Sequence, residues 1–312
     1  MVNALSKSWS LAISAVFLSV LPLVLPDYYL YLATELLIWA LFALSLDLLL
    51  GYTGLPSFGH AIFFGIPAYA VGIILTAGYP LIVALLVAVV AASLTGLILG
   101  YLATRTGGIG YIIVTLLASF AVFLIAFSWT NLTGGENGLY ISRAGTLAAL
   151  STQAAYAIVA VSTALIFLGA RWLVRSNYGL LLVGIKTNET RAQAMGYNTQ
   201  LYKFQITIVS AMIAGVAGVL YALLARSLSA ELVGPELSTE AVIWVLLGGT
   251  QTLLGPMLGA ALFILIKQAL NTIRAYPIFL GLLFIVVVVW APSGLLKLPK
   301  GLWKSFRRRN TR

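Results

Sequence analysis

The sequence contains no cysteine, a single histidine and few charged side chains, which make up 8% of its 312 residues. The absence of cysteine excludes disulfide scaffolds, thiol catalysis and cysteine-based metal sites. A metal site would have to be built from His60 and eight scattered carboxylates, which are poor material for one. Because a soluble domain carries about a quarter charged residues, this chain has too few charges to cover a water-exposed surface.

Apolar residues are abundant instead, at 61% of the chain, together with 29 glycines and 7 tryptophans. A spanning helix needs about 20 mostly apolar residues. The sequence therefore predicts an all-α integral membrane protein, a polytopic helical bundle of about 8–10 transmembrane helices with broken or re-entrant segments. The apolar runs lie at 9–26, 30–50, 58–77, 80–103, 110–130, 152–173, 204–225, 241–254, 256–272 and 277–294.

The net charge of +10 is uneven along the chain, and in a membrane protein this distribution indicates orientation rather than nucleic-acid binding. By the positive-inside rule, the basic segment 174–203 and the basic tail 297–312 are predicted to be cytoplasmic, as are both termini. Residues 1–296 are predicted to form a transmembrane domain that includes this cytoplasmic loop. The loops predicted on the other side carry acidic residues, namely Asp27, Glu136, Glu231, Glu236 and Glu240.

Two glycine- and proline-rich segments, 51–60 and 248–255, interrupt the apolar pattern. Freed backbone groups at membrane depth are tolerated only where they are buried in protein or line a water-filled cavity. These breaks and an outer loop at 134–138 are therefore candidates for a translocation path, against the alternatives of simple turns and close helix packing. The candidate path residues are Asp47, Gly54, Ser57, Gly59, His60, Gly134, Gly135, Glu136, Asn137, Gly248, Gly249 and Gln251.

The segment 176–197 is too polar to span a membrane and too patterned for a linker. Asn188 or Thr187 can cap a short helix that has Glu189 in its first turn and ends at Gly196. Such a helix, showing Ala192 and Met195, would offer a handle to another protein, unless it simply packs against the bundle. The candidate docking residues are Asn188, Glu189, Arg191, Ala192, Met195, Gly196 and Tyr197.

Catalytic motifs are missing from the sequence. It has no phosphate-binding G-x-x-x-x-G-K-[ST] run, no H-E-x-x-H and no G-x-S-x-G. An enzyme is therefore disfavoured, and no cofactor is predicted in this chain.

Four motifs occur in the order found in LivM-type permeases, the membrane subunits of bacterial ABC importers for branched-chain amino acids. GYTGLPSFGHAIFFGIPAY at 51–69 resembles the family signature, followed by GGENGL, SNYGLLLVGIKTNETRAQAMGYN and LLGGTQTLLGPMLGA at 134–139, 176–198 and 246–260. The resemblance implies a multi-pass protein of the bacterial inner (plasma) membrane, whose 187–198 segment is the coupling helix.

The same resemblance implies the partners: a homologous permease subunit of the LivH type, two cytoplasmic ATPase subunits of the LivG and LivF type that bind ATP and Mg²⁺, and an extracytoplasmic binding protein. The cargo it implies is a branched-chain or other hydrophobic amino acid. Urea, a short amide or another small solute is the alternative cargo. A secondary transporter or channel without ATPases is the alternative of a different class; it predicts paired ionisable groups in the bundle, for which only Asp47, His60, Lys267 and Glu35 are available.

Overall fold

The computed structural model describes residues 22, 25–141, 149–270, 281 and 294. Five helical segments in this part of the chain are long and apolar enough to cross a membrane. They are α2 (Asp27–Asp47) continued by the π-helix η1 (Leu48–Thr53), α4 (Leu81–Thr104), α5 (Gly108–Ser128), α7 (Thr152–Arg175) and α10 (Thr199–Ala225).

Shorter elements connect or accompany these spans. The helices are α3 (His60–Thr76), α6 (Thr130–Thr133), α8 (Asn177–Thr187), α9 (Glu189–Ala194), α11 (Pro235–Gly248) and α12 (Leu254–Leu270). Two 3-10 turns, η2 (Gly135–Asn137) and η4 (Ala230–Val233), and two short strands, β1 (Leu139–Tyr140) and β2 (Ser227–Leu228), complete the described elements.

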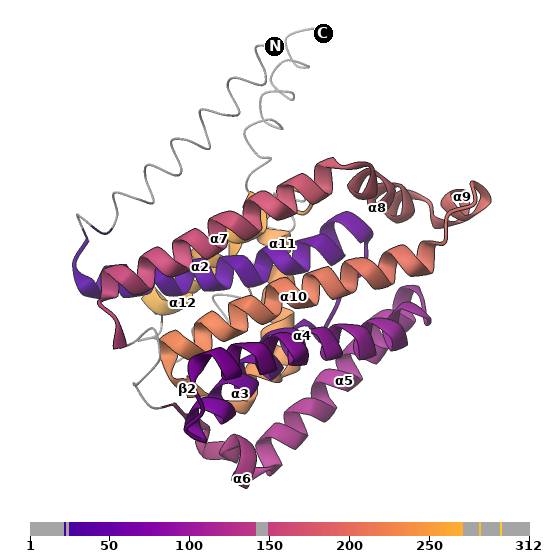
Figure 1. The fold of residues 1–312 in the computed structure, drawn as a ribbon. Coiled ribbons are helices and arrows are strands. Elements are labelled where there is room, and N and C mark those ends of the chain that lie inside the picture. Colours follow the sequence, from indigo (N-terminus) through magenta and orange to yellow (C-terminus); the bar gives the residue numbers. More distant parts are fainter. Residues whose placement is uncertain (1–21, 23–24, 142–148, 271–280, 282–293, 295–312) are drawn as a thin grey trace, which may run out of the picture.

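Helix α10 lies near the centre of the bundle and packs against α2, α3 and α4 (Figure 1). Its small residues allow this approach: a Cβ added to Gly218 would lie 1.9 Å from the carbonyl oxygen of Phe64, and one added to Gly215 would lie 2.7 Å from the Cβ of Ala92. Close contact through small residues is the usual way in which membrane helices associate. The glycines of α10 thus serve close helix packing.

Helices α4, α5 and α7 present large apolar side chains outward, and no more than 22% of the central window of each is buried. Leu86, Leu117 and Trp172 are examples, with exposed fractions of 61%, 62% and 76%. Outward apolar surface on long helices is what contact with lipid or with another membrane subunit requires. The predicted all-α membrane architecture is confirmed.

Helices α11 and α12 form an antiparallel hairpin. Lys267, near the end of α12, pairs with Glu240, near the start of α11, over 2.6 Å. The turn between the helices reaches the far end of α2, where its backbone bonds to Asp47. At about 1.5 Å per residue, the 14 residues of α11 extend only about 21 Å, short of a 30 Å hydrocarbon core. The hairpin therefore fits the broken or re-entrant segments that the sequence predicts.

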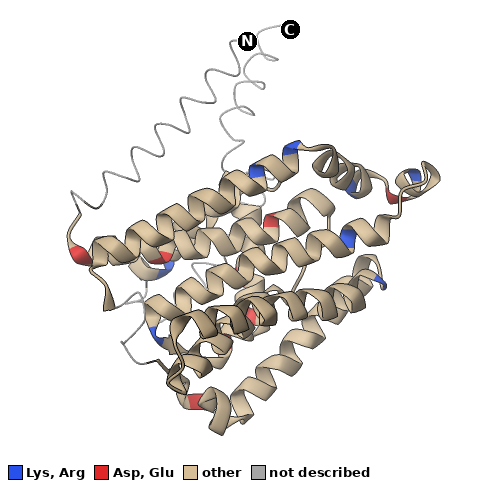
Figure 2. Ribbon diagram, viewed as in Figure 1, with Lys and Arg blue, Asp and Glu red and all other residues tan. Residues whose placement is uncertain are grey.

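The two ends of α10 define two ends of the molecule. Its first turn follows α9, and its last turn leads into β2, which pairs antiparallel with β1 in the register Leu139–Leu228. Its 27 residues separate these ends by about 40 Å. Basic residues gather at the α9 end, whereas acidic and basic residues mix at the β2 end (Figure 2).

Most predicted spans agree with the helices to within a few residues, but two boundaries are wrong. The helix that was expected to break at Gly51 stays helical through Thr53 and ends at Gly54. The span expected at 241–254 starts at Pro235 and ends at Gly248, since Pro235 suits a first helical position. The predicted spans 9–26 and 277–294, and the tail 297–312, lie outside the described residues.

Candidate functional site

The first break connects α2 to α3 through the π-helix η1 and the non-helical segment 54–59. A π-helix leaves backbone groups displaced from the regular ladder and is frequent at functional positions. Gly54 ends the turn at a φ of 73°, in the left-handed region that favours glycine. A Cβ added to Gly59 would lie 2.3 Å from the carbonyl oxygen of Thr115, so α5 passes directly against this segment.

Asp47 joins the two breaks to each other. Its side chain is fully buried and accepts hydrogen bonds from the backbone N–H groups of Gln251, at 2.9 Å, and Leu253, at 3.1 Å. Gln251 and Leu253 have positive φ angles of 62° and 58°, which cost free energy in residues other than glycine. The carboxylate therefore stabilises a strained hairpin turn, in the part of the bundle where the sequence predicted a path residue.

Lys186, at the end of α8, links the first break to the basic end of the molecule. Its Nζ donates a hydrogen bond to the carbonyl oxygen of Gly51 over 2.6 Å. Its stem also passes Gly54, where an added Cβ would lie 2.9 Å from Cγ of Lys186. A continuous set of contacts thus runs from α8 through η1 to Asp47 and the 249–253 turn.

His60 is fully buried at the start of α3 and bonds through Nε2 to Oγ of Ser45 over 2.8 Å. Ser45 Oγ donates to the carbonyl oxygen of Phe42, so it accepts from the histidine, which then carries its proton on Nε2. The ring packs against those of Phe42 and Phe63. The predicted inward placement of His60 is correct, but the side chain sits in a packed core. Ser57 is likewise fully buried, and its hydroxyl makes no hydrogen bond to a described group.

The glycines at 134–138 are required by the fold of this loop. Gly134, Gly135 and Gly138 all have positive φ, and a Cβ on Gly134 would lie 2.1 Å from the carbonyl oxygen of Gly138. Glu136 and Asn137 are exposed at the tip, beside the β1–β2 pair. The geometry explains the glycines through the turn, while a role in a path or in docking stays a prediction for the two polar residues.

The glycines of the second break bring the limbs of the hairpin together. An added Cβ on Gly248 would lie 1.8 Å from the carbonyl oxygen of Gly255. Gly249 follows with a φ of 108°. This break and the first one meet at Asp47, whereas the 134–138 loop lies at the β2 end. The structure thus brings together only part of the predicted path.

The predicted coupling helix exists as α9, six residues long, and its ends match the expected signals. Asn188 accepts a hydrogen bond from the backbone N–H of Arg191 over 2.9 Å, which is the expected N-cap. Gly196 has a φ of 88°, and the N–H of Tyr197 bonds to the carbonyl oxygen of Ala192. The helix therefore begins and ends where the sequence predicted.

Glu189 ties α9 to α10. It accepts from Lys203 Nζ at 2.6 Å and from Thr199 Oγ1 at 3.0 Å. Partial burial raises the pKa of Glu189, but the hydrogen bonds from Lys203 and Thr199 and the charge of Lys203 outweigh this, so the pKa lies below its ordinary value. α9 is thus fixed to the bundle by a charged contact.

Ala192 does not face outward, contrary to the prediction. Only 2% of it is exposed, because this face of α9 turns toward the bundle, whereas Met195 and Tyr197 are 65% and 44% exposed. Arg191 and Asn188 are also exposed. Five of the seven candidate residues are thus exposed, and we call them the α9 surface: Asn188, Arg191, Met195, Gly196 and Tyr197.

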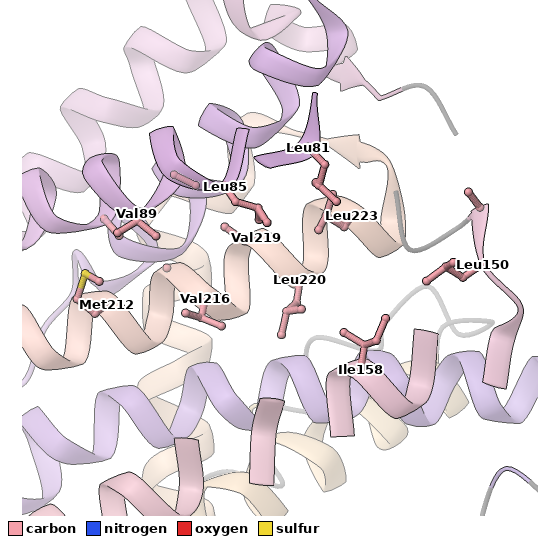
Figure 3. Close-up of a pocket in the computed structure, with 14 residues that line it drawn as sticks. Leu81, Leu85, Val89, Leu150, Ile158, Met212, Val216, Val219, Leu220 and Leu223 are labelled. Atoms are coloured by element: carbon pink, nitrogen blue, oxygen red, sulfur yellow. The ribbon is translucent and has the colours of Figure 1, made fainter. Parts of the chain in front are cut away.

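A cavity of about 760 Å³ lies between α4, α7 and α10, and every described residue that lines it is apolar (Figure 3). Leu85, Val216 and Leu220 line it from α4 and α10, and Ile158 lines it from α7. It contains no polar side chain that would orient a charged solute. Within the described chain, no three potential metal-ligating side chains come together either.

A bundle of apolar helices with broken segments and an ordered helix at one end is the architecture of a membrane permease subunit. The chain belongs to the family described as branched-chain amino acid transport system / permease component, which matches residues 28–289. It is therefore a multi-pass transport protein of the inner (plasma) membrane. The sequence-based predictions of class and family are confirmed.

Two relatives illustrate the distance within this family. The chain is 24% identical to the high-affinity branched-chain amino acid transport system permease protein LivM of Escherichia coli, over 86% of this chain and 70% of that protein. It is 26% identical to a probable branched-chain amino acid transport permease protein LivM of Methanocaldococcus jannaschii, over 81% of this chain and 89% of that protein. No solved structure matches the chain.

Proposed function

We propose that this chain carries branched-chain amino acids across the membrane as one permease subunit of an ATP-driven importer. In this proposal, a second homologous permease completes the path, two cytoplasmic ATPase subunits bind ATP and Mg²⁺, and an extracytoplasmic binding protein delivers the cargo. The names of the relatives support the cargo. The α9 surface supports the coupling to separate motors.

The coupling proposal rests on two properties of α9: its Met195 side chain is exposed, and the helix is firmly attached to α10. Met195 is 65% exposed, although an apolar side chain on a polar loop gains nothing from contact with water. The helix that bears it is capped at both ends and joined to α10 through Glu189 and Lys203. A partner that pushes on this surface therefore moves α10 as well.

The contact between Lys186 and Gly51 supplies a route from this end of the molecule to the breaks. α8 is directly followed by α9, so a displacement of α9 also acts on α8. From Lys186 the contacts continue to Asp47 and to the 249–253 turn. We propose that docking of the ATPases shifts these two breaks together and so opens the path.

The test uses the transporter reconstituted in proteoliposomes with all of its subunits. Met195→Glu places a charge on the α9 surface and is expected to lower ATP-driven leucine import at least tenfold with no change in membrane insertion. Met195→Leu keeps the apolar surface and is expected to behave like the wild type. Unchanged import in Met195→Glu would contradict the docking assignment.

The same vesicles separate the alternatives. Import of urea or a short amide in place of leucine would favour the alternative cargo. Leucine uptake that persists without ATPase subunits would favour a secondary transporter. That alternative predicts ionisable pairs within the spans. The described chain contains two salt bridges, of which Lys267–Glu240 joins helices of the bundle and Lys203–Glu189 serves α9.

A further inference from the structure

A second cavity, of about 340 Å³, lies at the end of the bundle opposite α9, where α2, α10, η4, α11 and α12 meet. Four of the eight acidic side chains of the chain line it: Glu35, Glu231, Glu236 and Glu240. Lys267 is the basic side chain among its lining residues. We call this cavity the glutamate pocket.

The carboxylates of the glutamate pocket are only partly compensated within the described chain. Glu240 pairs with Lys267 over 2.6 Å, and Glu35 accepts a hydrogen bond from the indole Nε1 of Trp39 at 3.2 Å. Like charges that share a partly enclosed site repel one another, and a cation placed between them relieves the repulsion. The pocket therefore has an excess of negative charge that suits a positively charged group.

The wall of the pocket is aromatic. Trp39, Tyr221 and Trp244 line it, with the ring of Trp39 centred 5.0 Å from that of Tyr221 and 5.8 Å from that of Trp244. Aromatic faces attract an ammonium group and provide apolar contact for an aliphatic chain. Leu232 and Ile264 add aliphatic surface.

A separate observation indicates that the ligand also carries an acceptor. Trp244, one of the lining residues, is 1% exposed, and its indole N–H has no hydrogen-bond partner among the described groups. Because buried N–H groups in native proteins are almost always paired, this donor lacks an acceptor that a bound molecule can supply. A carboxylate on the ligand meets this need and also suits the charge of Lys267.

We propose that the glutamate pocket binds the zwitterionic backbone of an aliphatic α-amino acid, with the ammonium group among the glutamates, the carboxylate at Trp244 and Lys267, and the side chain against the aromatic wall. The inference rests on the proposed function and adds a place where the cargo is held. It assigns the binding role to residues outside both breaks.

The experiment measures L-leucine binding to the purified permease–ATPase complex in nanodiscs, by calorimetric titration without nucleotide or binding protein. Trp244→Phe keeps the ring and removes only the N–H. Because no described group accepts this N–H, the variant is expected to keep the melting temperature of the wild type and to bind leucine about tenfold more weakly. Glu35→Gln is expected to weaken binding by a similar factor, and Asp27→Asn, at an exposed residue outside the candidate sites, to leave it unchanged.

Two analogues separate the halves of the ligand. 3-Methylbutylamine lacks the carboxylate and is expected to bind the wild type and Trp244→Phe equally. 4-Methylpentanoate lacks the ammonium group and is expected not to bind. Leucine binding that is unchanged in both Trp244→Phe and Glu35→Gln would overturn the subsite while leaving the proposed function intact. Absence of ATP-driven leucine import by the wild type would overturn the proposed function instead.

Discussion

Asp47 and Gln251 lie 204 positions apart in the sequence, yet the carboxylate of Asp47 accepts the backbone N–H of Gln251 at 2.9 Å. The second oxygen of the same carboxylate accepts the N–H of Leu253. One buried side chain thus fixes the turn of the α11–α12 hairpin to the C-terminal end of α2. The two interruptions that the sequence shows separately are one structural unit.

Removal of the Asp47 carboxylate is predicted to destabilise this unit. In Asp47→Ala, two backbone N–H groups at a strained turn lose their acceptor, at a cost of about 1–3 kcal/mol for each buried group. Asp47→Asn keeps one acceptor oxygen and should lose less. Thermal unfolding in detergent, followed by tryptophan fluorescence, should rank the wild type above Asp47→Asn and Asp47→Ala last. Equal melting temperatures for all three would contradict the role of the carboxylate.

The close approach of α10 to α3 predicts that Gly218→Ala is destabilising. Its Cβ would meet the carbonyl oxygen of Phe64 at 1.9 Å, and overpacking of this kind costs about 1–3 kcal/mol. Gly169→Ala in α7 is the matched control, because no atom lies within 4 Å of its added Cβ. The control should unfold at or slightly above the wild-type temperature, and a similar loss in both variants would argue against the packing explanation.

Loss of Glu189 and loss of Lys203, the two partners of one salt bridge, are predicted to destabilise the protein to different extents. The side chain of Lys203 is 7% exposed, whereas that of Glu189 is 41% exposed. Glu189→Ala leaves a buried ammonium group without its partner and should destabilise the α9–α10 junction more than Lys203→Met, which leaves a carboxylate that water can reach. Hydrogen exchange of residues 188–203 measures the loss of protection in each variant. A larger loss in Lys203→Met than in Glu189→Ala would refute the argument.

The same contact predicts a loosening of α9 in acid. Because the pKa of Glu189 is lowered in the folded state, its stabilising contribution is complete above its ordinary pKa of 4.5 and is lost as the pH falls through the lower, folded value. Exchange protection in α9 should therefore be constant from pH 7 to pH 5 and decline below that range. In Glu189→Gln this decline should be absent, and its persistence there would assign it to another group.

The separation of the two ends predicts opposite labelling of single cysteines, since the chain has none of its own. Asn137→Cys, beside β1, should react with a membrane-impermeant maleimide from outside intact cells. Met195→Cys, on the α9 surface, should react only after the membrane is opened. Because about 40 Å of α10 separates these ends, labelling of both from one side would refute the proposed orientation.

The sequence predicted the parts of this structure that depend on local signals. Asn188 and Gly196 mark the ends of α9 because capping and positive φ are encoded within a few residues. Ala192 was placed wrongly because α9 is only six residues long, too short for its sequence periodicity to indicate which face is buried. That face is determined by packing against the rest of the bundle.

Contacts between distant segments could not be predicted in this way. In the hydrogen bond between Asp47 and Gln251 the donor is a backbone N–H. Because nearly every residue has this group, the sequence does not indicate which residue is the partner. The glutamate pocket was equally hidden, because Glu35, Glu236 and Lys267 come from three helices. The sequence indicates only that Glu35 and Lys267 are isolated ionisable residues within apolar runs. It does not indicate that they line one pocket.

The bond from Lys186 to Gly51 has a consequence for comparisons across this family. Its acceptor is a main-chain oxygen, but position 51 is not free to vary, because an added Cβ would lie 1.9 Å from Oδ1 of Asp47 and 2.9 Å from the backbone nitrogen of Gln251. A relative at 24–26% identity can therefore keep this joint unchanged only if it keeps the glycine as well as the lysine. An alignment can trace the joint through both positions.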